Sequence, residues 1–454
     1  MSAPRQQRRA AVLALLAAVA GTPVAAAQRQ DFLLPGHWLR VAAGSGGAWL
    51  LVAPDSKAPR TLLELRWRER AMRTLVEGLP AALDALVPAP QGAGGGPWLG
   101  GRGRLLAIDP QAAATAAPSE VGGALVAEIP DGRIATGAPP FLALASVGQA
   151  LVVTPGEGGL RTVATHRLPV KAERESWGVA LRSPSLSFVG NWLVAGPEQE
   201  GRLLRSALLG AHGERVDVLS RLPEPEHIAE SAVVALGDRP LLVVGAFHGL
   251  GIASKKRLRV FALVAGEGGA PRGPLLAGEL PGRAWQEMQI LAADVDGDGR
   301  SDLVLVGAEG LTEKSVAITA YRTRGDGRLT ADPATASVAV GGGEWRYGDV
   351  TGDGRPDLVI RAGAKLSVVA GGGRFGLPSG AAVPLADLPA PPDAGAPQHE
   401  VTVKVGTGGG EVSRTELERQ TGWGLADLDG DGVLEVLAWA PLADGRTRLS
   451  VVGR

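Results

Sequence analysis

Short apolar runs bounded by turn residues make up the hydrophobic pattern of this chain. The runs recur at intervals of roughly 40–80 residues, about the length of one propeller blade. Eight such runs stand at residues 48–53, 104–108, 150–153, 192–195, 240–244, 303–306, 358–360 and 436–439. Brief runs of Val, Leu and Ala are typical of buried strands, so the pattern predicts a repeated β structure.

The segments between these runs predict further strands. Residues 315–321 alternate loosely between apolar and polar positions, as half-exposed strands of a meander do. Residues 60–79 combine Leu and Trp with many Arg and Glu, which fits one amphipathic helix or two strands. The surrounding strand pattern favours two strands there, and the whole chain is expected to be all-β.

Three of the runs follow an acidic loop of one design. Residues 294–302 read D-V-D-G-D-G-R-S-D, residues 349–357 read D-V-T-G-D-G-R-P-D, and residues 427–435 read D-L-D-G-D-G-V-L-E. Carboxylates this close repel one another unless a cation neutralises them. Side-chain oxygens at positions 1, 3, 5 and 9, with a backbone carbonyl at position 7, make a calcium cage. The glycines let the backbone bend around the ion.

The expected calcium ligands occupy these positions in all three loops. Thr351 replaces the second acid of the middle loop, which is therefore expected to bind calcium more weakly. The alternative is a turn whose carboxylates accept hydrogen bonds from the loop's own amides. Magnesium fits less well, because it usually keeps several waters. The ligands expected for up to three Ca²⁺ ions are Asp294, Asp296, Asp298, Arg300, Asp302, Asp349, Thr351, Asp353, Arg355, Asp357, Asp427, Asp429, Asp431, Val433 and Glu435.

An EF-hand is the main rival interpretation of these loops. It needs a bidentate Glu at position 12 and a helix on either side. Position 12 is Leu305, Ile360 or Ala438, and none of these side chains binds calcium. The flanks are short and rich in Val and Leu, so we expect loops between strands instead.

The acidic loop, the strand after it and a later glycine turn together resemble the FG-GAP/VCBS repeat. Residues 371–376, G-G-G-R-F-G, match that later turn, and residues 324–328 match it in part. The resemblance is specific over about residues 285–454. It implies an integrin-α-like β-propeller with calcium in the loop between the first two strands of a blade. The family favours seven blades and the eight apolar runs favour eight, so the expected fold is a seven- or eight-bladed β-propeller.

The propeller domain is expected to fill residues 28–454. Degenerate blades occupy about residues 28–284, and blades with calcium loops occupy about residues 285–454. Residues 236–243 resemble an acidic loop that has lost most of its carboxylates. Residues 377–399 are rich in Pro and Ala, which predicts an extended surface insertion.

Strand pairing is expected to join the two ends of the domain. The apolar residues 449–452 form the third strand of the last repeat, and residues 32–34 are expected to supply the missing fourth. Pairing between them closes the ring and removes sheet edges that would otherwise aggregate.

Residues 1–27 have the pattern of a secretory signal peptide. Arg5, Arg8 and Arg9 precede an apolar segment too short to span a bilayer comfortably, and an A-x-A motif precedes Gln28. A retained membrane anchor is the alternative. Cleavage changes the formal charge from −1 to −1 − 3 = −4. The mature protein is expected to be secreted or periplasmic, with no integral membrane segment. The chain has no cysteine, so calcium can replace disulfides as the staple.

Two aromatic positions and one tripeptide each have two interpretations. Trp345 and Trp423 stand four residues before a first acid of a loop. Core packing of a blade is favoured over stacking on a sugar. Residues 324–326 read R-G-D, an integrin-recognition tripeptide, but a polar hairpin turn is favoured.

Composition and motifs limit the function. No long basic run lies outside the N-terminus, so nucleic acid is not an expected partner. The six histidines show no paired metal spacing, and the chain has neither a G-x-S-x-G motif nor a cysteine nucleophile.

We expect a calcium-binding, non-catalytic scaffold that recognises a protein or a glycan. The alternative is a propeller hydrolase or lyase acting on polysaccharide or lipid, for which His166, His212, His227 or His248 would converge in a central pocket. A passive cell-surface spacer is a third interpretation.

Overall fold

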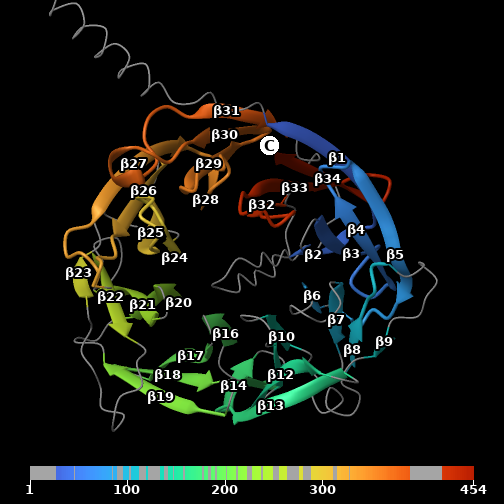
Figure 1. Ribbon diagram of the computed structural model, residues 1–454, viewed down its shortest axis with the longest axis horizontal. Helices are drawn as coiled ribbons and strands as arrows, with labels where there is room; N and C mark the ends of the chain where they lie inside the picture. The colour runs from blue at the N-terminus through green and yellow to red at the C-terminus, as the bar shows by residue number, and fades with distance from the viewer. Residues whose placement is uncertain are drawn as a thin grey trace, which may run out of the picture.

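The computed structural model shows a ring of antiparallel β-sheets around a central axis (Figure 1). In the described part of the chain, eight sheets have four strands and one, β14–β15, has two. None of the helices described there is long and apolar enough to cross a bilayer. The structure describes residues 27–388 and 422–454, except residues 45–46, 84, 89–95, 102–103, 112–118, 121–132, 137–141, 147, 157–158, 176–177, 183–185, 190–191, 201, 211–212, 222–226, 237–238, 249–254, 263–275, 280–287, 310–313 and 327.

The four-stranded sheets follow one another along the chain, and we number them in that order. Sheet 1 contains β2 (Trp38–Gly44), β3 (Gly47–Ala53), β4 (Arg60–Arg66) and β5 (Ala71–Leu79). Sheet 2 contains β6 (Ala85–Pro88), β7 (Pro97–Gly101), β8 (Arg104–Ala107) and β9 (Ser119–Glu120). Sheet 3 contains β10 (Arg133–Thr136), β11 (Leu142–Ser146), β12 (Gln149–Gly156) and β13 (Gly159–Arg167). The two-stranded sheet contains β14 (Lys171–Glu175) and β15 (Gly178–Arg182).

The second half of the ring has the same order of strands. Sheet 4 contains β16 (Leu186–Val189), β17 (Trp192–Glu200), β18 (Leu203–Gly210) and β19 (Arg215–Arg221). Sheet 5 contains β20 (His227–Leu236), β21 (Arg239–His248), β22 (Lys255–Ala262) and β23 (Leu276–Glu279). Sheet 6 contains β24 (Met288–Ala293), β25 (Asp302–Glu309), β26 (Lys314–Tyr321) and β27 (Ala334–Gly341). Sheet 7 contains β28 (Glu344–Gly348), β29 (Asp357–Ala362), β30 (Lys365–Val369) and β31 (Val383–Asp387), with the short 3₁₀ turn η2 (Arg374–Gly376) before β31. Sheet 8 contains β32 (Gly422–Ala426), β33 (Glu435–Pro441), β34 (Arg446–Gly453) and β1 (Gln28–Pro35).

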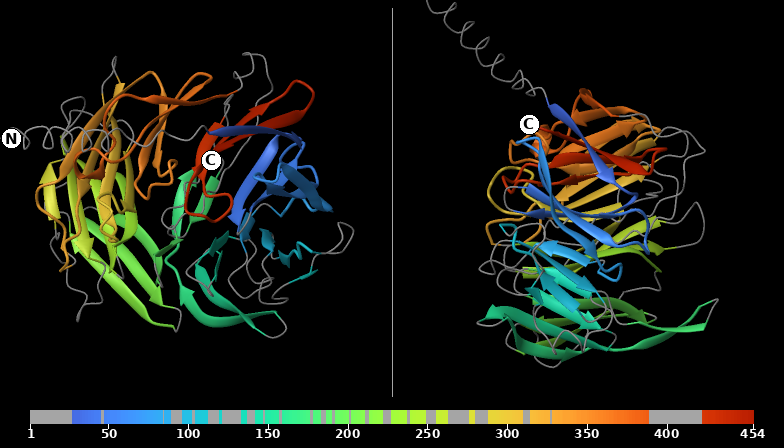
Figure 2. Two further views of the ribbon diagram at one scale, coloured as in Figure 1. Left: turned by 45° about the horizontal axis from the view of Figure 1, so that its top comes forward. Right: turned by 90° about the vertical axis from the view of Figure 1, so that its right-hand side faces the viewer.

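The first strand of each sheet lies nearest the central axis, and the fourth lies at the outer rim (Figures 1 and 2). In sheet 8 the outer strand is β1, which pairs antiparallel with β34 and places Phe32 opposite Leu449. The predicted closure of the ring by the two ends of the domain is therefore confirmed.

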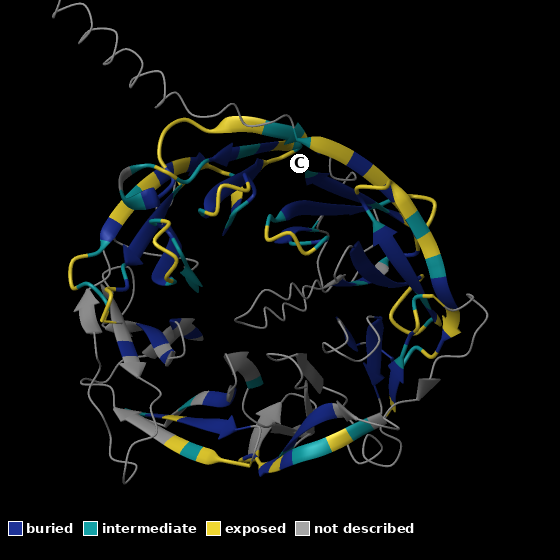
Figure 3. Cartoon of the chain, viewed as in Figure 1, coloured by how far each residue is buried: buried dark blue, intermediate teal, exposed yellow. Residues whose placement is uncertain are grey.

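The core consists of layers between neighbouring sheets. Leu34, Leu50 and Leu437 pack between sheets 8 and 1, and Val304 and Leu358 pack between sheets 6 and 7. Sheets that pack face to face bury both of their surfaces, which explains the continuous apolar runs of the second strands. Exposed positions gather on the outer strands, and β1 alternates between exposed and buried residues (Figure 3).

The eight apolar runs fall in eight different sheets, one run to each. Six of them are the second strand of their sheet, but residues 104–108 and 150–153 lie in β8 and β12, the third strands of sheets 2 and 3. A third strand is also buried on both faces, so hydrophobicity alone does not distinguish it from a second strand. Residues 60–79 form β4 and β5, which confirms two strands and excludes the helix.

The predicted surface insertion at residues 377–399 is wrong in its first part. Residues 383–387 form β31, the outer strand of sheet 7, although Pro384 lies within it. Proline is tolerated on an edge strand, because no neighbour needs its missing N–H. Leu377 and Leu388 on either side of the strand are buried. The rest of the predicted insertion lies outside the described residues.

Candidate metal centres

Each acidic loop connects the first and second strands of its sheet. The strand ladder stops at Ala293 opposite Asp302, at Gly348 opposite Asp357 and at Ala426 opposite Glu435. The ninth residue of each loop therefore begins the second strand and is held by the sheet. In sheet 5, by contrast, Leu236 pairs with Arg239, so only two residues separate the first and second strands. Strands flank all three loops, which excludes the EF-hand interpretation.

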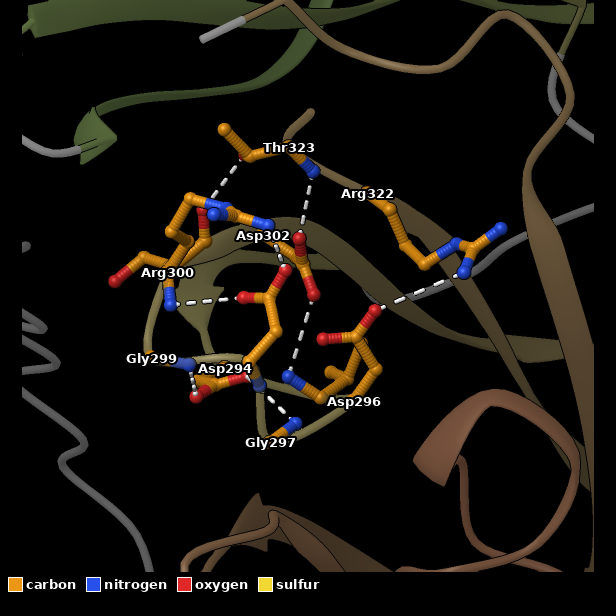
Figure 4. Close-up of polar contacts among 11 residues, drawn as sticks. Asp294, Asp296, Gly297, Gly299, Arg300, Asp302, Arg322 and Thr323 are labelled. Atoms are coloured by element: carbon orange, nitrogen blue, oxygen red, sulfur yellow. Dashed lines mark hydrogen bonds and ion pairs between the residues drawn. The ribbon is translucent and has the colours of Figure 1, made fainter. Parts of the chain in front are cut away.

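The first loop wraps its backbone around the carboxylate of Asp294 (Figure 4). Asp294 Oδ1 accepts hydrogen bonds from the N–H groups of Gly297 (2.8 Å) and Asp298 (3.1 Å), and Oδ2 accepts one from Gly299 (2.7 Å). Gly297 and Gly299 have φ values of 76° and 82°. Residues with a Cβ rarely adopt this conformation, so glycine is required at both positions.

The other two loops repeat this geometry. Asp349 accepts hydrogen bonds from the N–H groups of Gly352 (2.7 Å) and Gly354 (2.8 Å). Asp427 accepts them from Gly430 (2.7 Å) and Gly432 (3.0 Å). All four of these glycines have positive φ. The first carboxylate thus organises the loop, as the turn interpretation expects, and its remaining lone pairs can still bind a cation.

The side chain of the ninth residue of each loop accepts hydrogen bonds from backbone N–H groups. Asp302 is buried, and its carboxylate accepts hydrogen bonds from the N–H groups of Thr323 (2.7 Å) and Val295 (3.3 Å). Asp357 likewise accepts hydrogen bonds from Val350 and Gly371. These bonds hold one carboxylate rigidly at the base of each site.

Two of the loops bring three carboxylates together. Ligand oxygens of Asp294, Asp296 and Asp302 lie within 4.8 Å of one another in the first loop, and those of Asp427, Asp429 and Glu435 do so in the third. Oδ1 of Asp296 is buried and accepts no hydrogen bond. A buried, unpartnered carboxylate oxygen is costly, so the first loop fits a cation at this position.

Electrostatics of the two clusters also favour a cation. The pKa of Asp302 is raised to about 6, mainly by burial. The nearby carboxylates of Asp296 and Asp298 contribute to the rise, and its backbone hydrogen bonds oppose it. Burial and the three acids of its own loop raise the pKa of Glu435 to about 8. A raised carboxyl pKa means that burial and the neighbouring charges make the ionised form unfavourable. A bound cation would remove the repulsion, and hard carboxylate oxygens suit Ca²⁺.

The remaining predicted ligands are placed differently. Asp298 forms an ion pair with Arg300, and Asp431 forms one with Arg68. Asp298 and Asp431 also cap the N–H groups of Arg300 and Val433. In the middle loop Thr351 stands in place of the second acid, and its N–H donates to Asp357. The metal roles of these residues, of the other residues of the middle loop and of the six clustered carboxylates all stay predictions.

The three loops form one continuous row along the ring. A Cβ on Gly376, in the glycine turn of sheet 7, would lie 1.5 Å from the carbonyl oxygen of Val295, so this turn packs directly on the first loop. Leu434 in the third loop donates a 2.8 Å hydrogen bond to the carbonyl of Asp349 in the middle loop. Each acidic loop is therefore also part of the contact between neighbouring sheets.

Sequence reasoning missed three arginines, each of which meets the third position of one loop. Arg322 Nη1 lies 3.7 Å from Asp296 Oδ2 (Figure 4). Arg454 donates to the carbonyl of Thr351, and Arg68 forms an ion pair with Asp429. No local pattern identifies Arg68 or Arg454, because each comes from a segment far away in the chain.

The other residues singled out in the sequence have structural roles. Trp345 and Trp423 are buried in the layers beside sheet 7, which confirms core packing. Residues 325–326 lie in a turn, beside which Arg324 N–H donates a hydrogen bond to the carbonyl of Arg328. His166 lies on β13, an outer strand, and its Nε2 is 3.1 Å from the carbonyl oxygen of Gly210. That position is away from the central axis. His212 lies outside the described residues.

Comparison with known proteins supports the repeat. The sequence model of the FG-GAP-like repeat matches residues 294–360, which contain the first acidic loop, the rest of sheet 6 and the middle loop. The chain thus carries an FG-GAP-like repeat in an all-β propeller. No curated protein matches the sequence.

Two solved structures show how distant the structural relatives are. Drosophila Plexin A, in a complex with Semaphorin 1b, has 12% identity and a TM-score of 0.34, covering 79% of this chain and 88% of its own. The WD40 domain of SCAP from fission yeast has 9% identity and a TM-score of 0.32, covering 94% of this chain and 98% of its own. Similarity at this level carries no argument about function.

Proposed function

We propose that this protein is a calcium-stabilised propeller that binds up to three Ca²⁺ ions in its acidic loops. The observation that carries the proposal is the convergence of Asp294, Asp296 and Asp302 around a buried oxygen that accepts no hydrogen bond. The third loop repeats the cluster with Asp427, Asp429 and Glu435. The middle loop has one carboxylate fewer and binds the ion more weakly.

Calcium in this arrangement acts on the contacts between sheets. Because the loops lie in a row and contact the neighbouring sheet, an ion that neutralises one loop also strengthens the contact beside it. Ligands that bind only the folded protein raise its stability in proportion to the logarithm of their concentration. We infer that each four-stranded sheet is one blade, that the propeller has eight blades and that calcium strengthens sheets 6, 7 and 8.

The propeller serves as a non-catalytic scaffold that recognises a protein or glycan outside the cytoplasm. Support for export is the signal-peptide pattern of residues 1–27, followed by β1 at Gln28. Millimolar external calcium would keep the loops filled there. Expression of the full chain, followed by mass determination of the exported product, tests this part. A product that begins at Gln28 is expected, and a retained N-terminus would contradict it.

Thermal melting with and without calcium tests the metal part. The wild-type protein is expected to melt several degrees higher in Ca²⁺ than in EDTA. Asp296→Ala should lose part of this difference and reduce the number of ions seen by calorimetric titration. Asp326→Ala is the matched control, because Asp326 is an exposed acid of the turn at 324–328. Identical melting curves in Ca²⁺ and EDTA would refute the stabilising role.

The recognition role needs a separate measurement. A glycan array probed with the purified protein in Ca²⁺ and in EDTA distinguishes a glycan-binding propeller from other scaffolds. Binding that requires Ca²⁺ is the expected result for a glycan ligand. An empty array, together with no binding to a panel of purified extracellular proteins, would favour the passive spacer.

A further inference from the structure

Arg68 is the charged group from another sheet that enters the third acidic loop. Its side chain contacts the carboxylates of Asp429 and Asp431 together. Both carboxylate oxygens of Asp429 are buried, and Asp429 belongs to the three-carboxylate cluster of this loop. The guanidinium therefore contacts a carboxylate that a metal ion would also need.

Local structure holds Arg68 in this position. It lies in the turn between β4 and β5 of sheet 1, where Arg70 N–H donates a 3.0 Å hydrogen bond to the carbonyl of Trp67. Trp67 is buried in the layer between sheets 8 and 1, and its ring lies where a Cβ on Gly453 would come within 2.7 Å of it. The Arg68 guanidinium also lies 5.7 Å from the ring centroid of Trp67. The packing of Trp67 in the core thus fixes the turn independently of the contact between Arg68 and the third loop.

The first loop has a weaker version of this contact. Arg322 approaches Asp296 at 3.7 Å, and its guanidinium lies 4.7 Å from the centroid of the Phe375 ring. Arg322 thus contacts a single carboxylate of the cluster at long range, whereas Arg68 contacts two carboxylates directly. The carboxylate clusters of the first and third loops are alike, but the arginine beside each cluster makes a different contact: Arg322 is distant in the first loop, and Arg68 is in direct contact in the third.

We propose that Arg68 is the resident cation of the third loop and sets its affinity for calcium below that of the first loop. This inference rests on the proposed calcium function. Arg68 contacts Asp429 through Oδ2, so a Ca²⁺ ion that takes this oxygen as a ligand must displace the guanidinium from it. In metal-free protein Arg68 neutralises part of the loop and ties sheet 8 to sheet 1. When Ca²⁺ binds, it replaces the Arg68 guanidinium, and the ion pair between sheets 1 and 8 is lost.

The test isolates the third loop in the full chain. Asp294→Ala and Asp349→Ala remove the first acid of the other two loops, and calorimetric titration with Ca²⁺ then reports the third loop. Adding Arg68→Gln should tighten calcium binding about two- to fivefold, the range expected from the loss of a partly exposed ion pair. Arg70→Gln is the control, because it removes the same charge two residues away in the same turn.

Melting in EDTA provides a second readout that does not depend on metal binding. Arg68→Gln should melt lower than Arg70→Gln in EDTA, and the difference should shrink in excess Ca²⁺. The same comparison in the otherwise unaltered chain covers the case in which the background substitutions prevent folding.

The outcomes separate the two proposals. Equal or weaker calcium binding by Arg68→Gln, with binding by the parent intact, overturns the exchange but leaves the calcium function standing. Absence of binding by both the parent and Arg68→Gln refutes the calcium function at this loop and overturns the exchange with it. Equal melting of the two variants in EDTA overturns the role of Arg68 as the resident cation.

Discussion

The hydroxyl of Ser450 donates a 2.7 Å hydrogen bond to Asp31 Oδ1, although the two residues stand 419 positions apart in the chain. The bond lies in sheet 8, where β1 from the start of the domain completes three strands from its end. An open ring would expose the backbone edge of β34, and pairing with β1 covers it. The closure is therefore a point at which stability of the whole ring can be tested.

The first prediction concerns this closing strand. Leu34 on β1 is fully buried between sheets 8 and 1, so Leu34→Ala should lower the free energy of unfolding by about 3 kcal/mol. Leu33→Ala on the same strand is the matched control, because Leu33 is 45% exposed and should change stability by about 0.5 kcal/mol or less. Denaturant unfolding measures both. Equal effects would mean that β1 does not close the ring in solution.

The second prediction separates the structural and metal roles of the loop carboxylates. Asp302→Ala should destabilise the protein by about 2 kcal/mol even in EDTA, because it leaves the buried N–H groups of Val295 and Thr323 without their acceptor. Asp296→Ala should have little effect in EDTA, because Oδ1 of Asp296 accepts no hydrogen bond. In Ca²⁺ both variants should lose stability relative to wild type. A large loss for Asp296→Ala in EDTA would contradict this division of roles.

The third prediction concerns the turn that packs on the first loop. Gly376 and Gly380 both have positive φ, so alanine is strained at either position by about 1–2 kcal/mol. Only at Gly376 would the new Cβ also meet a backbone carbonyl, that of Val295, whereas no atom lies within 4 Å at Gly380. Gly376→Ala should therefore be clearly less stable than Gly380→Ala in thermal melting. Similar melting temperatures would show that the turn does not press on the loop.

The fourth prediction concerns pH. Burial lowers the pKa of His166 from 6.5, despite its bond to the carbonyl of Gly210. In the unfolded chain this histidine takes up a proton as the pH falls through about 6.5, while the folded protein resists it. Stability is therefore present above this pH and is lost on acidification, by at most about 1.4 kcal/mol per pH unit for one group.

His166→Gln provides the measurement of this effect. Its free energy of unfolding should fall less steeply than that of wild type between about pH 7 and pH 5, with the two curves parallel near pH 8. Curves that remain parallel throughout would show that His166 does not resist protonation in the folded protein.

Local features of the sequence were the easiest to predict. Each acidic loop has all of its predicted ligands within nine consecutive positions, so spacing alone identifies the carboxylates that converge at residues 294, 296 and 302. The closing pair of strands was also predictable, because the last repeat lacked one strand and the first apolar residues supplied it. In sheets 2 and 3 the apolar run predicted from the sequence is the third strand and not the second, because both strands are buried and therefore equally apolar.

Sequence by itself thus determined the all-β repeat and the acidic pattern of the loops, since both follow from the order of neighbouring residues. The tertiary structure decided which groups from elsewhere meet these loops. Arg68 reaches Asp431 across 363 positions, and the glycine turn around Gly376 packs against Val295 of the preceding sheet. Such contacts exist only because the closed ring packs sheets face to face. The spacing of residues along the chain does not indicate which loops this packing brings together.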